Sequence, residues 1–310
     1  MRPEMQFPQD LDVLDRADLC VAGGGIAGVA AALKAAASGL ETVLLEERGA
    51  LGWEVSHGLE LYLGGGRPEG VLGRIVASLA ERNASRDGML DPVACECLLD
   101  ELVLAAKVRV HLRTLAGGWE RETGLVRVTT KSGPLAVQAR VTIDATETAR
   151  LARGAGAAFA AADTSMRARA FLLCAVEPPS GAETIDLPGV GRVCLRPTLW
   201  PREAHVSFAF RAGDPDRAEG EARRQMARIV EALRREKPGF ARANLSLSAH
   251  DAFVLQAPKV EEDSVPDGLL VAGPACLGRK PTLEERAALG EAAAAGARQS
   301  VQSVHPVPDR

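Results

Sequence analysis

Two short apolar runs and one longer alanine-rich segment alternate along the first fifty positions of the chain. The runs at 18–22 and 42–45 have the length of buried strands, and the segment at 29–38 between them has the composition of a helix. Four glycines separate the first run from that segment, and Gly39 follows it as an end signal. The order strand, glycine turn, helix, strand within about 30 residues predicts a βαβ unit with two parallel strands.

Later segments repeat both kinds of pattern. Apolar residues at helical spacing predict helices over 71–84, 92–107, 217–236 and 282–295. Asp91 before Pro92 and the pair Thr282 and Glu285 are expected to cap two of them. The glycine-rich stretch 49–70 has no period and is expected to form an ordered loop.

Short apolar runs separated by turn residues predict the β-rich parts of the chain. Those between 108 and 146 predict a small antiparallel meander that ends in a buried strand at 141–145. Strand-like runs recur over 166–212, and one more precedes the last helix at 268–273.

Composition narrows the classes of function. The chain has 310 residues, a net charge of -4 and 4% aromatic residues, which gives no electrostatic or stacking case for nucleic acid or for an anionic membrane surface. Six cysteines in this length do not make a disulfide scaffold, and no His or Cys spacing predicts a metal site. The N-terminal segment MRPEMQFPQDLDVLDRAD is acidic and broken by proline, so we expect no signal peptide and a cytoplasmic protein.

The motif Gly23-x-Gly25-x-x-Gly28 carries the clearest chemistry. Gly23 permits the tight turn out of the strand, Gly25 lets the backbone approach a pyrophosphate, and Gly28 lets the helix pack close to the sheet. The first helical turn supplies unpaired N–H groups for the anion, so the candidate set includes Gly24, Ile26 and Ala27.

An acidic residue ends the second predicted strand. Glu46 stands close to where a ribose-binding carboxylate is expected, and an acid there disfavours the 2′-phosphate of NADP. Glu47 and Arg48 are included with it in the candidate cofactor-binding set, although Glu47 is more simply explained as a solvated neighbour. The βαβ unit alone does not separate FAD from NAD.

Three further stretches carry a resemblance. The segment Val43 to Gly52, which includes Arg48, is similar to "VLLVERRGFLGG", residues 141–152 are similar to "VVIDATGDADLA", and residues 267–274 are similar to "DNLLVAGR". In these stretches the sequence resembles the FAD-dependent oxidoreductase family, whose FAD domain is of the glutathione-reductase type. The resemblance covers 17–155 and 264–296 and implies FAD as the cofactor, which disfavours an NAD enzyme.

The resemblance also implies positions for residues outside the glycine motif. Asp144 and Ala145 would lie near the ADP half of the cofactor, and Gly273 and Pro274 near the flavin end. Three positions depart from the family pattern: Glu147 and Trp53 replace glycines, and Pro274 replaces an Arg or Asp. We include Trp53 in the candidate cofactor-binding set because of its place in the loop.

The predicted fold is α/β: a Rossmann-like FAD-binding domain with a parallel sheet, a β-meander and a smaller β-rich cap. We expect the FAD domain to comprise residues 1–160 and 262–310 and the cap, with the substrate side, to comprise 161–261. His57 is the candidate proton-transfer residue, although a histidine bonded to a nearby carbonyl is an equally good interpretation.

The expected reaction is hydride transfer between FAD and an unidentified small organic substrate, with a homo- or hetero-oligomer left open. The alternative is a non-catalytic or degenerate flavin-fold subunit of a larger redox complex, which the short cap, Pro274 and Glu147 favour.

Overall fold

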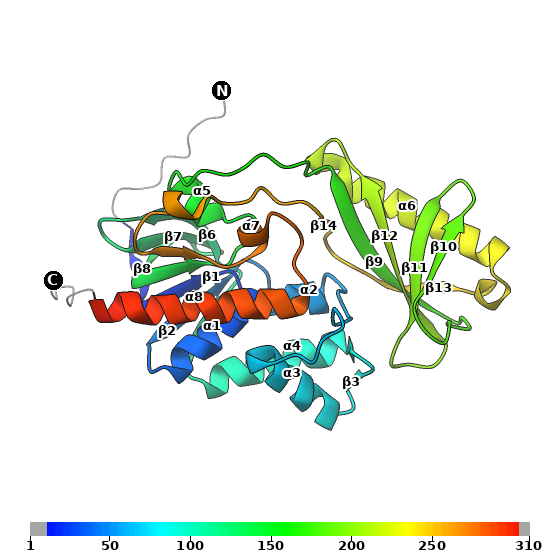
Figure 1. Ribbon diagram of the computed structural model, residues 1–310, viewed down its shortest axis with the longest axis horizontal. Coiled ribbons are helices and arrows are strands. Elements are labelled where there is room, and N and C mark those ends of the chain that lie inside the picture. Colours follow the sequence, from blue (N-terminus) through cyan, green and yellow to red (C-terminus); the bar gives the residue numbers. More distant parts are fainter. Residues whose placement is uncertain (1–10, 304–310) are drawn as a thin grey trace.

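The computed structural model describes residues 11–303, and its two large β-sheets lie in different halves of an elongated molecule (Figure 1). The first sheet has seven strands in the order β5-β2-β1-β8-β7-β6, with β15 paired to β8 beside that path. Their bounds are β1 Val13–Ala22, β2 Thr42–Glu46, β5 Arg109–Leu112, β6 Leu115–Glu120, β7 Leu125–Thr130, β8 Gly133–Asp144 and β15 Leu269–Val271.

The centre of this sheet is parallel. β1 pairs in parallel with β2 and β8, and β15 joins the second half of β8 in the same direction. β7 pairs antiparallel with the first half of β8, and β6 pairs antiparallel with β7. The predicted α/β class, with a parallel Rossmann-type sheet and an attached meander, is confirmed.

The strand β5 corrects one prediction. We expected residues 109–112 to open the antiparallel meander, but β5 pairs in parallel with β2 at the edge of the sheet. The physical reason is the helix before it, because a helix between two strands of one sheet returns the chain in the same direction. That helix is α4, Pro92–Ala105, and Asp91 caps it by accepting the N–H groups of Val93 and Ala94 at 2.9 Å each.

Both faces of the parallel strands are buried, as expected for a doubly covered sheet. Leu19 and Val21 of β1 belong to the core under the helices α1, α3, α4 and α8, whereas Cys20 and Ala22 belong to the core on the other face, toward the meander. The covering helices are α1 Ile26–Ala37, α3 Gly70–Glu81 and α8 Leu283–Ser303, with the short α5 Arg150–Gly154 and α7 Pro274–Leu277 on the meander side.

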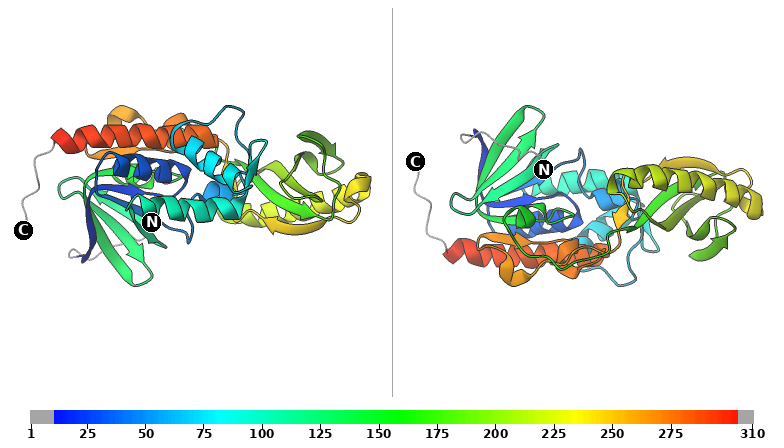
Figure 2. Two further views of the ribbon diagram at one scale, coloured as in Figure 1. Left: turned by 90° about the horizontal axis from the view of Figure 1, so that it is seen from below. Right: turned by 90° about the horizontal axis from the view of Figure 1, so that it is seen from above.

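Helix α8 lies alongside α1 (Figure 2). A Cβ added at Gly290 would be 2.0 Å from the carbonyl oxygen of Ala27, so only glycine permits this approach. The predicted capping box begins α8: Thr282 accepts the N–H of Glu285 at 3.3 Å and Glu285 accepts the N–H of Thr282 at 2.9 Å. The helix continues to Ser303, past the predicted end at 295.

The loop after β2 contains more structure than its composition predicted. A single helical turn, α2 Trp53–Ser56, begins after Gly52, whose φ of +60° lies in the left-handed region. Farther along, two-residue strands form a small hairpin, β3 Ser85–Arg86 and β4 Met89–Leu90.

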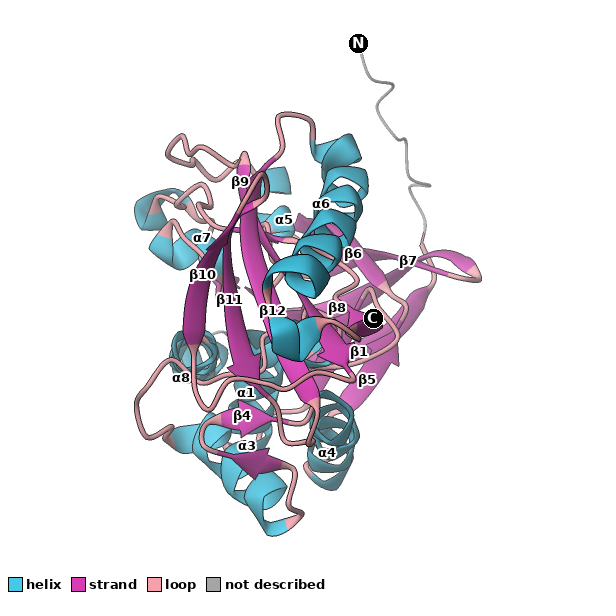
Figure 3. Cartoon of the chain, turned by 90° about the vertical axis from the view of Figure 1, so that its right-hand side faces the viewer, coloured by secondary structure: helices cyan, strands magenta, loops and turns pink. Residues whose placement is uncertain are grey.

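The second sheet has six strands in the order β10-β11-β12-β9-β13, with β14 paired to β9. Its strands β10, β11 and β12 face the viewer in Figure 3. Its helix α6, Pro215–Glu236, contributes Ile229 and Leu233 to a core shared with the sheet. The strand bounds are β9 Met166–Cys174, β10 Glu183–Leu187, β11 Gly191–Pro197, β12 Glu203–Arg211, β13 Asn244–Ser248 and β14 Phe253–Val254. One 3-10 turn, Pro238–Phe240, lies between α6 and β13, and another, Glu262–Ser264, comes after β14.

Side chains of the second sheet contact the loop that contains α2. Phe253 of β14 stacks on Trp53 with ring centroids 5.0 Å apart, and His205 of β12 lies 3.0 Å, Nε2 to O, from the carbonyl of Leu59. The division of the chain at 161 and 261 into two domains stays a prediction.

No helix among residues 11–303 is both long and apolar enough to cross a membrane. The N-terminal residues on which the signal-peptide prediction partly rested lie outside the described range.

Candidate functional site

The glycine turn between β1 and α1 is as tight as the motif requires. Gly23 has a φ of +105°, and a Cβ added there would be 2.6 Å from the carbonyl oxygen of Ala145. A Cβ at Gly28 would be 1.7 Å from the carbonyl oxygen of Gly23, so the backbone of α1 packs directly against the backbone at the end of β1. Gly25 is the N-cap of α1 and offers no side-chain cap to the helix.

The carboxylate of Glu46 lies beside this turn, at the end of β2. It accepts the N–H of Gly24 at 2.6 Å and the N–H of Arg48 at 2.7 Å, and its residue is 2% exposed. Burial raises the pKa of Glu46, while these two backbone donors act in the opposite direction.

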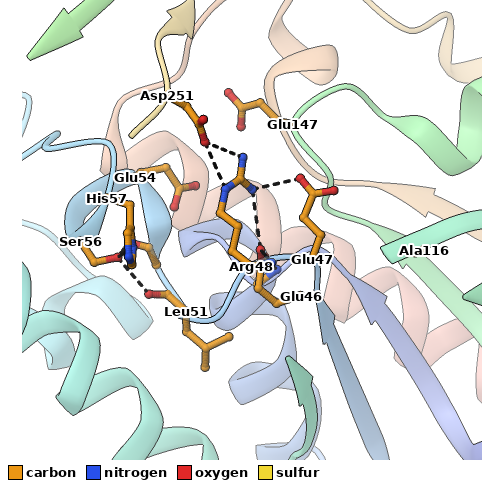
Figure 4. Close-up of polar contacts among 12 residues, drawn as sticks. Glu46, Glu47, Arg48, Leu51, Glu54, Ser56, His57, Ala116, Glu147 and Asp251 are labelled. Carbon is orange, nitrogen blue, oxygen red and sulfur yellow. Dashed lines mark hydrogen bonds and ion pairs between the residues drawn. The ribbon is translucent and has the colours of Figure 1, made fainter. Parts of the chain in front are cut away.

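Charged side chains surround Glu46 (Figure 4). The Arg48 guanidinium lies between the carboxylates of Glu47, at 3.1 Å, and Asp251, at 3.0 Å. It also lies over the Trp53 ring, 4.4 Å from its centroid. Glu47 in turn pairs with Arg150 at 2.8 Å, so the carboxylate expected to be only solvated takes part in an ion-pair network.

A small cavity opens at the glycine turn. Its free volume is about 20 Å³, which is room for about one water molecule. The residues around it are Gly23, Gly25, Leu45, Glu46, Glu47, Arg48, Trp53, Thr114, Ala116, Ala145, Thr146, Glu147 and Arg150. The structure thus brings together seven of the residues chosen from the sequence, and it adds Thr114 and Ala116, which the misassigned direction of β5 had hidden.

Other predicted residues lie near the cavity without lining it. Gly24, Ile26, Ala27 and Gly28 form the turn and the first turn of α1. The Asp144 carboxylate is fully buried and accepts the N–H groups of Thr146 and Ala152. Gly273 and Pro274 begin α7, and a Cβ added at Gly273 would be 3.3 Å from the carbonyl oxygen of Thr146.

Sequence reasoning did not single out two buried charged residues at this site. The Glu54 carboxylate accepts the N–H of Ile26 at 3.0 and 3.2 Å, and it lies 3.2 Å from Nη1 of Arg286. The same guanidinium donates to both oxygens of Glu147, at 2.9 and 3.1 Å. Glu54 and Arg286 are each 1% exposed. Their positions in a loop and in a charged helical turn gave no signal of this burial.

His57 does not line the cavity at the glycine turn. It belongs to a neighbouring open cleft of about 820 Å³, which it shares with Arg48, His250 and Asp251, among others. Its Nδ1 lies 2.9 Å from the Ser56 hydroxyl, and its ring meets His250 edge to face at 4.5 Å. Burial, and then the charge of His250, lower the pKa of His57.

Among residues 11–303, no group of three or more His, Cys, Asp or Glu side chains is arranged to hold a metal ion.

The family model of FAD dependent oxidoreductases matches residues 18–178, more than half of the chain and the part that contains the glycine turn, Glu46 and the cavity. The chain belongs to this family. FAD is therefore the cofactor that family membership assigns to it, and the predicted family is confirmed. No curated protein matches the whole sequence significantly.

Solved structures share the fold of this FAD dependent oxidoreductase. A geranylgeranyl bacteriochlorophyll reductase-like protein from Thermoplasma acidophilum has a TM-score of 0.70 at 18% identity, with 93% of this chain and 79% of that chain covered. A triple mutant of the flavin-dependent brominase Bmp2 has a TM-score of 0.67 at 15% identity, with 93% and 81% covered. The myxobacterial FAD-dependent chondrochloren halogenase CndH has a TM-score of 0.67 at 16% identity, with 90% and 73% covered.

The residues present fit FAD unequally. The glycine turn allows close approach of the backbone because no side chain projects from Gly23 or Gly28, and Glu46 lies beside it at the end of β2. Both features suit the adenosine half of FAD. The N-terminal end of α1, where a pyrophosphate would bind, is contacted by the carboxylate of Glu54. Pockets for small molecules enclose roughly 300–1,000 Å³, so FAD requires side chains around this cavity to move.

Proposed function

We propose that the protein is an FAD-dependent oxidoreductase that transfers a hydride between a small organic substrate and the flavin. The observation that supports this most directly is the glycine turn of Gly23, Gly25 and Gly28 next to Glu46, within the segment that the family model matches. When FAD is bound, the flavin ring supplies the electron-accepting chemistry, and the protein supplies orientation and charge.

The chain's own residues would hold the adenosine half of the cofactor. Glu46, at the end of β2, would accept hydrogen bonds from the ribose hydroxyls. These would replace the hydrogen bonds that it accepts from the N–H groups of Gly24 and Arg48. Thr114 lines the same cavity from the β5–β6 turn and Ala116 from the start of β6, and both would contact the adenine side. A buried acid at position 46 disfavours a ligand with a 2′-phosphate.

His57 is the proposed proton acceptor on the substrate side. Its lowered pKa keeps the imidazole neutral near pH 7, so it is suited to accept a proton. The Ser56 hydroxyl lies 3.2 Å from the Gly52 carbonyl, to which it donates. Its oxygen then accepts a hydrogen bond from the Nδ1–H group of His57, so that Nε2 is the unprotonated, basic atom. The cleft shared with His250 and Asp251 is large enough for a small substrate.

A second candidate function has its own support. A non-catalytic flavin-fold subunit would have no need of an accessible pyrophosphate-binding helix end, and Glu54 contacts that end here. Pro274, which lacks an N–H group, starts α7 at the position where the family has Arg or Asp. A subunit of this kind would have the same fold as the proposed enzyme but would not turn over a substrate.

The first experiment is the visible absorption spectrum of the purified full-length protein, with the cofactor released by heat and identified by mass. FAD near one per chain supports the cofactor assignment and permits a substrate screen by flavin bleaching. A flavin-loaded protein that no donor or acceptor turns over favours the subunit. A colourless protein that does not take up added FAD contradicts the oxidoreductase.

A further inference from the structure

The Glu54 carboxylate fills the space above the glycine turn. A Cβ added at Gly25 would be 2.5 Å from Oε1 of Glu54, so the room that glycine leaves at this position is taken by the carboxylate. Both oxygens lie within hydrogen-bonding distance of the Ile26 N–H, the first free donor of α1. An anion is favourable there because helix N-termini carry unpaired N–H groups and a partial positive charge.

Arg286 supplies a positive charge to the same carboxylate. Its Nη1 forms an ion pair with Oε1 of Glu54 at 3.2 Å, and the residue belongs to α8. We call the pair formed by the Ile26 N–H and the Arg286 guanidinium the anion site. A backbone N–H and a guanidinium that converge on one point are the donor set by which proteins bind phosphate.

The charged side chains around the anion site carry more negative than positive charge when Glu54 is ionised. Three guanidinium groups, those of Arg48, Arg150 and Arg286, face five carboxylates, those of Glu46, Glu47, Glu54, Glu147 and Asp251. A pyrophosphate carries further negative charge, so its entry beside an ionised Glu54 would place like charges within a few ångströms in a buried setting. The donors satisfy either Glu54 or a phosphate oxygen, but not both.

We propose that Glu54 is an internal competitor of the FAD pyrophosphate for the anion site, and that FAD binds only as Glu54 leaves it. This inference rests on the proposed FAD-binding function and adds a determinant of cofactor affinity. Glu54 thereby weakens FAD binding, and removal of its charge strengthens binding to any ligand that carries the pyrophosphate.

The test compares ligands with and without the pyrophosphate on the flavin-free full-length protein. Dissociation constants for ADP and adenosine are measured by calorimetry, and those for FAD by fluorescence quenching. Glu54→Gln keeps the shape of the side chain and an oxygen for the Ile26 N–H but removes the charge, so we expect it to bind ADP and FAD about tenfold or more tightly than the wild type. Adenosine affinity should change less than about twofold, since adenosine carries no charge to repel.

A matched control separates this effect from general loosening. Glu183 of β10 also pairs with a partly buried cation, the Lys237 ammonium at 3.0 Å, but within the second sheet and away from the glycine turn. Glu183→Gln should leave the ADP affinity unchanged. Tighter ADP binding in both variants would overturn the proposal. Glu54→Ala, which empties the space, gives a second measurement if the Gln variant folds poorly.

The outcomes distinguish this proposal from the proposed function. Equal FAD affinity in the wild type and in Glu54→Gln would overturn the competitor role and leave FAD binding intact. No FAD binding by either protein would overturn both. Weaker ADP binding in Glu54→Gln would mean that Glu54 helps to shape the site, which also overturns the proposal.

Discussion

Replacement of Arg286 offers the strictest test of how the buried charges at the glycine turn are held. Arg286→Met keeps much of the side-chain length and removes the guanidinium that lies 3.2 Å from Glu54 and binds Glu147. Glu147 is about one-third exposed and can regain water, but Glu54 is 1% exposed and cannot. In the variant, Glu54 must therefore either stay charged without a partner or take up a proton.

Protonation sets the size of the effect. A carboxyl group with a reference pKa of 4.5 costs about 3 kcal/mol to protonate at pH 7, since each pH unit above the pKa contributes about 1.4 kcal/mol. Burial already raises the pKa of Glu54 in the wild type, and loss of the Arg286 charge raises it further. The stability of the variant is therefore greatest below about pH 4.5 and falls more steeply than that of the wild type as pH rises to neutrality. We expect Arg286→Met to lose up to about 3 kcal/mol at pH 7 and up to about 2 kcal/mol at pH 6.

Urea unfolding at several pH values measures this, with the double variant Glu54→Gln, Arg286→Met as the control. The double variant buries no unpaired charge, so it should recover most of the lost stability and show no added slope with pH. If the free-energy losses of the two single variants simply add in the double variant, or if the loss in Arg286→Met is the same at pH 6 and pH 7, the reasoning is refuted.

Two further predictions concern other buried positions. His205 donates to the Leu59 carbonyl, and burial lowers its pKa from 6.5 to about 4; stability present above pH 6.5 should therefore be lost as pH falls toward 4, by about 3 kcal/mol in total. In His205→Gln, the free energy of unfolding in urea should no longer decrease in this way between pH 6.5 and pH 4. If it depends on pH as steeply as in the wild type, the prediction is wrong. Gly28→Ala places a Cβ 1.7 Å from the Gly23 carbonyl oxygen and should destabilise the protein by about 3 kcal/mol or more. The control Gly154→Ala meets no atom within 4 Å, so an equal loss there by urea unfolding would refute the steric argument.

The βαβ unit could be predicted because its signals are contiguous in the sequence. A buried apolar run, a glycine turn and an alanine-rich segment each specify a local backbone conformation, and β1, α1 and β2 lie where these signals predicted them. The cap of α4 by Asp91 and the capping box of α8 were predictable for the same reason, because the donor and acceptor are at most three residues apart.

The remaining features depend on contacts between distant segments. The direction of β5 follows from how α4 crosses the sheet, which no apolar pattern within residues 109–112 records. The burial of Glu54 and Arg286 depends on α8 packing against α1, so in the sequence both residues look like ordinary polar positions. His57 was predictable as a candidate, but its place in a cleft separate from the glycine turn was not.

The order of the strands in the first sheet has a consequence for synthesis on the ribosome. β8 has its second half covered by β15, and α1 is covered by α8, yet both covering segments come after the whole second sheet in the chain. The second sheet lies in one continuous stretch from β9 to β14 and can pair its strands as soon as that stretch emerges. Until β15 arrives, the edge of β8 at 142–144 has unpaired backbone groups, a surface that favours pairing with other chains. The nascent protein therefore completes its later sheet first and its nucleotide-binding sheet last, and it stays exposed to aggregation at the edge of β8 until β15 has been made.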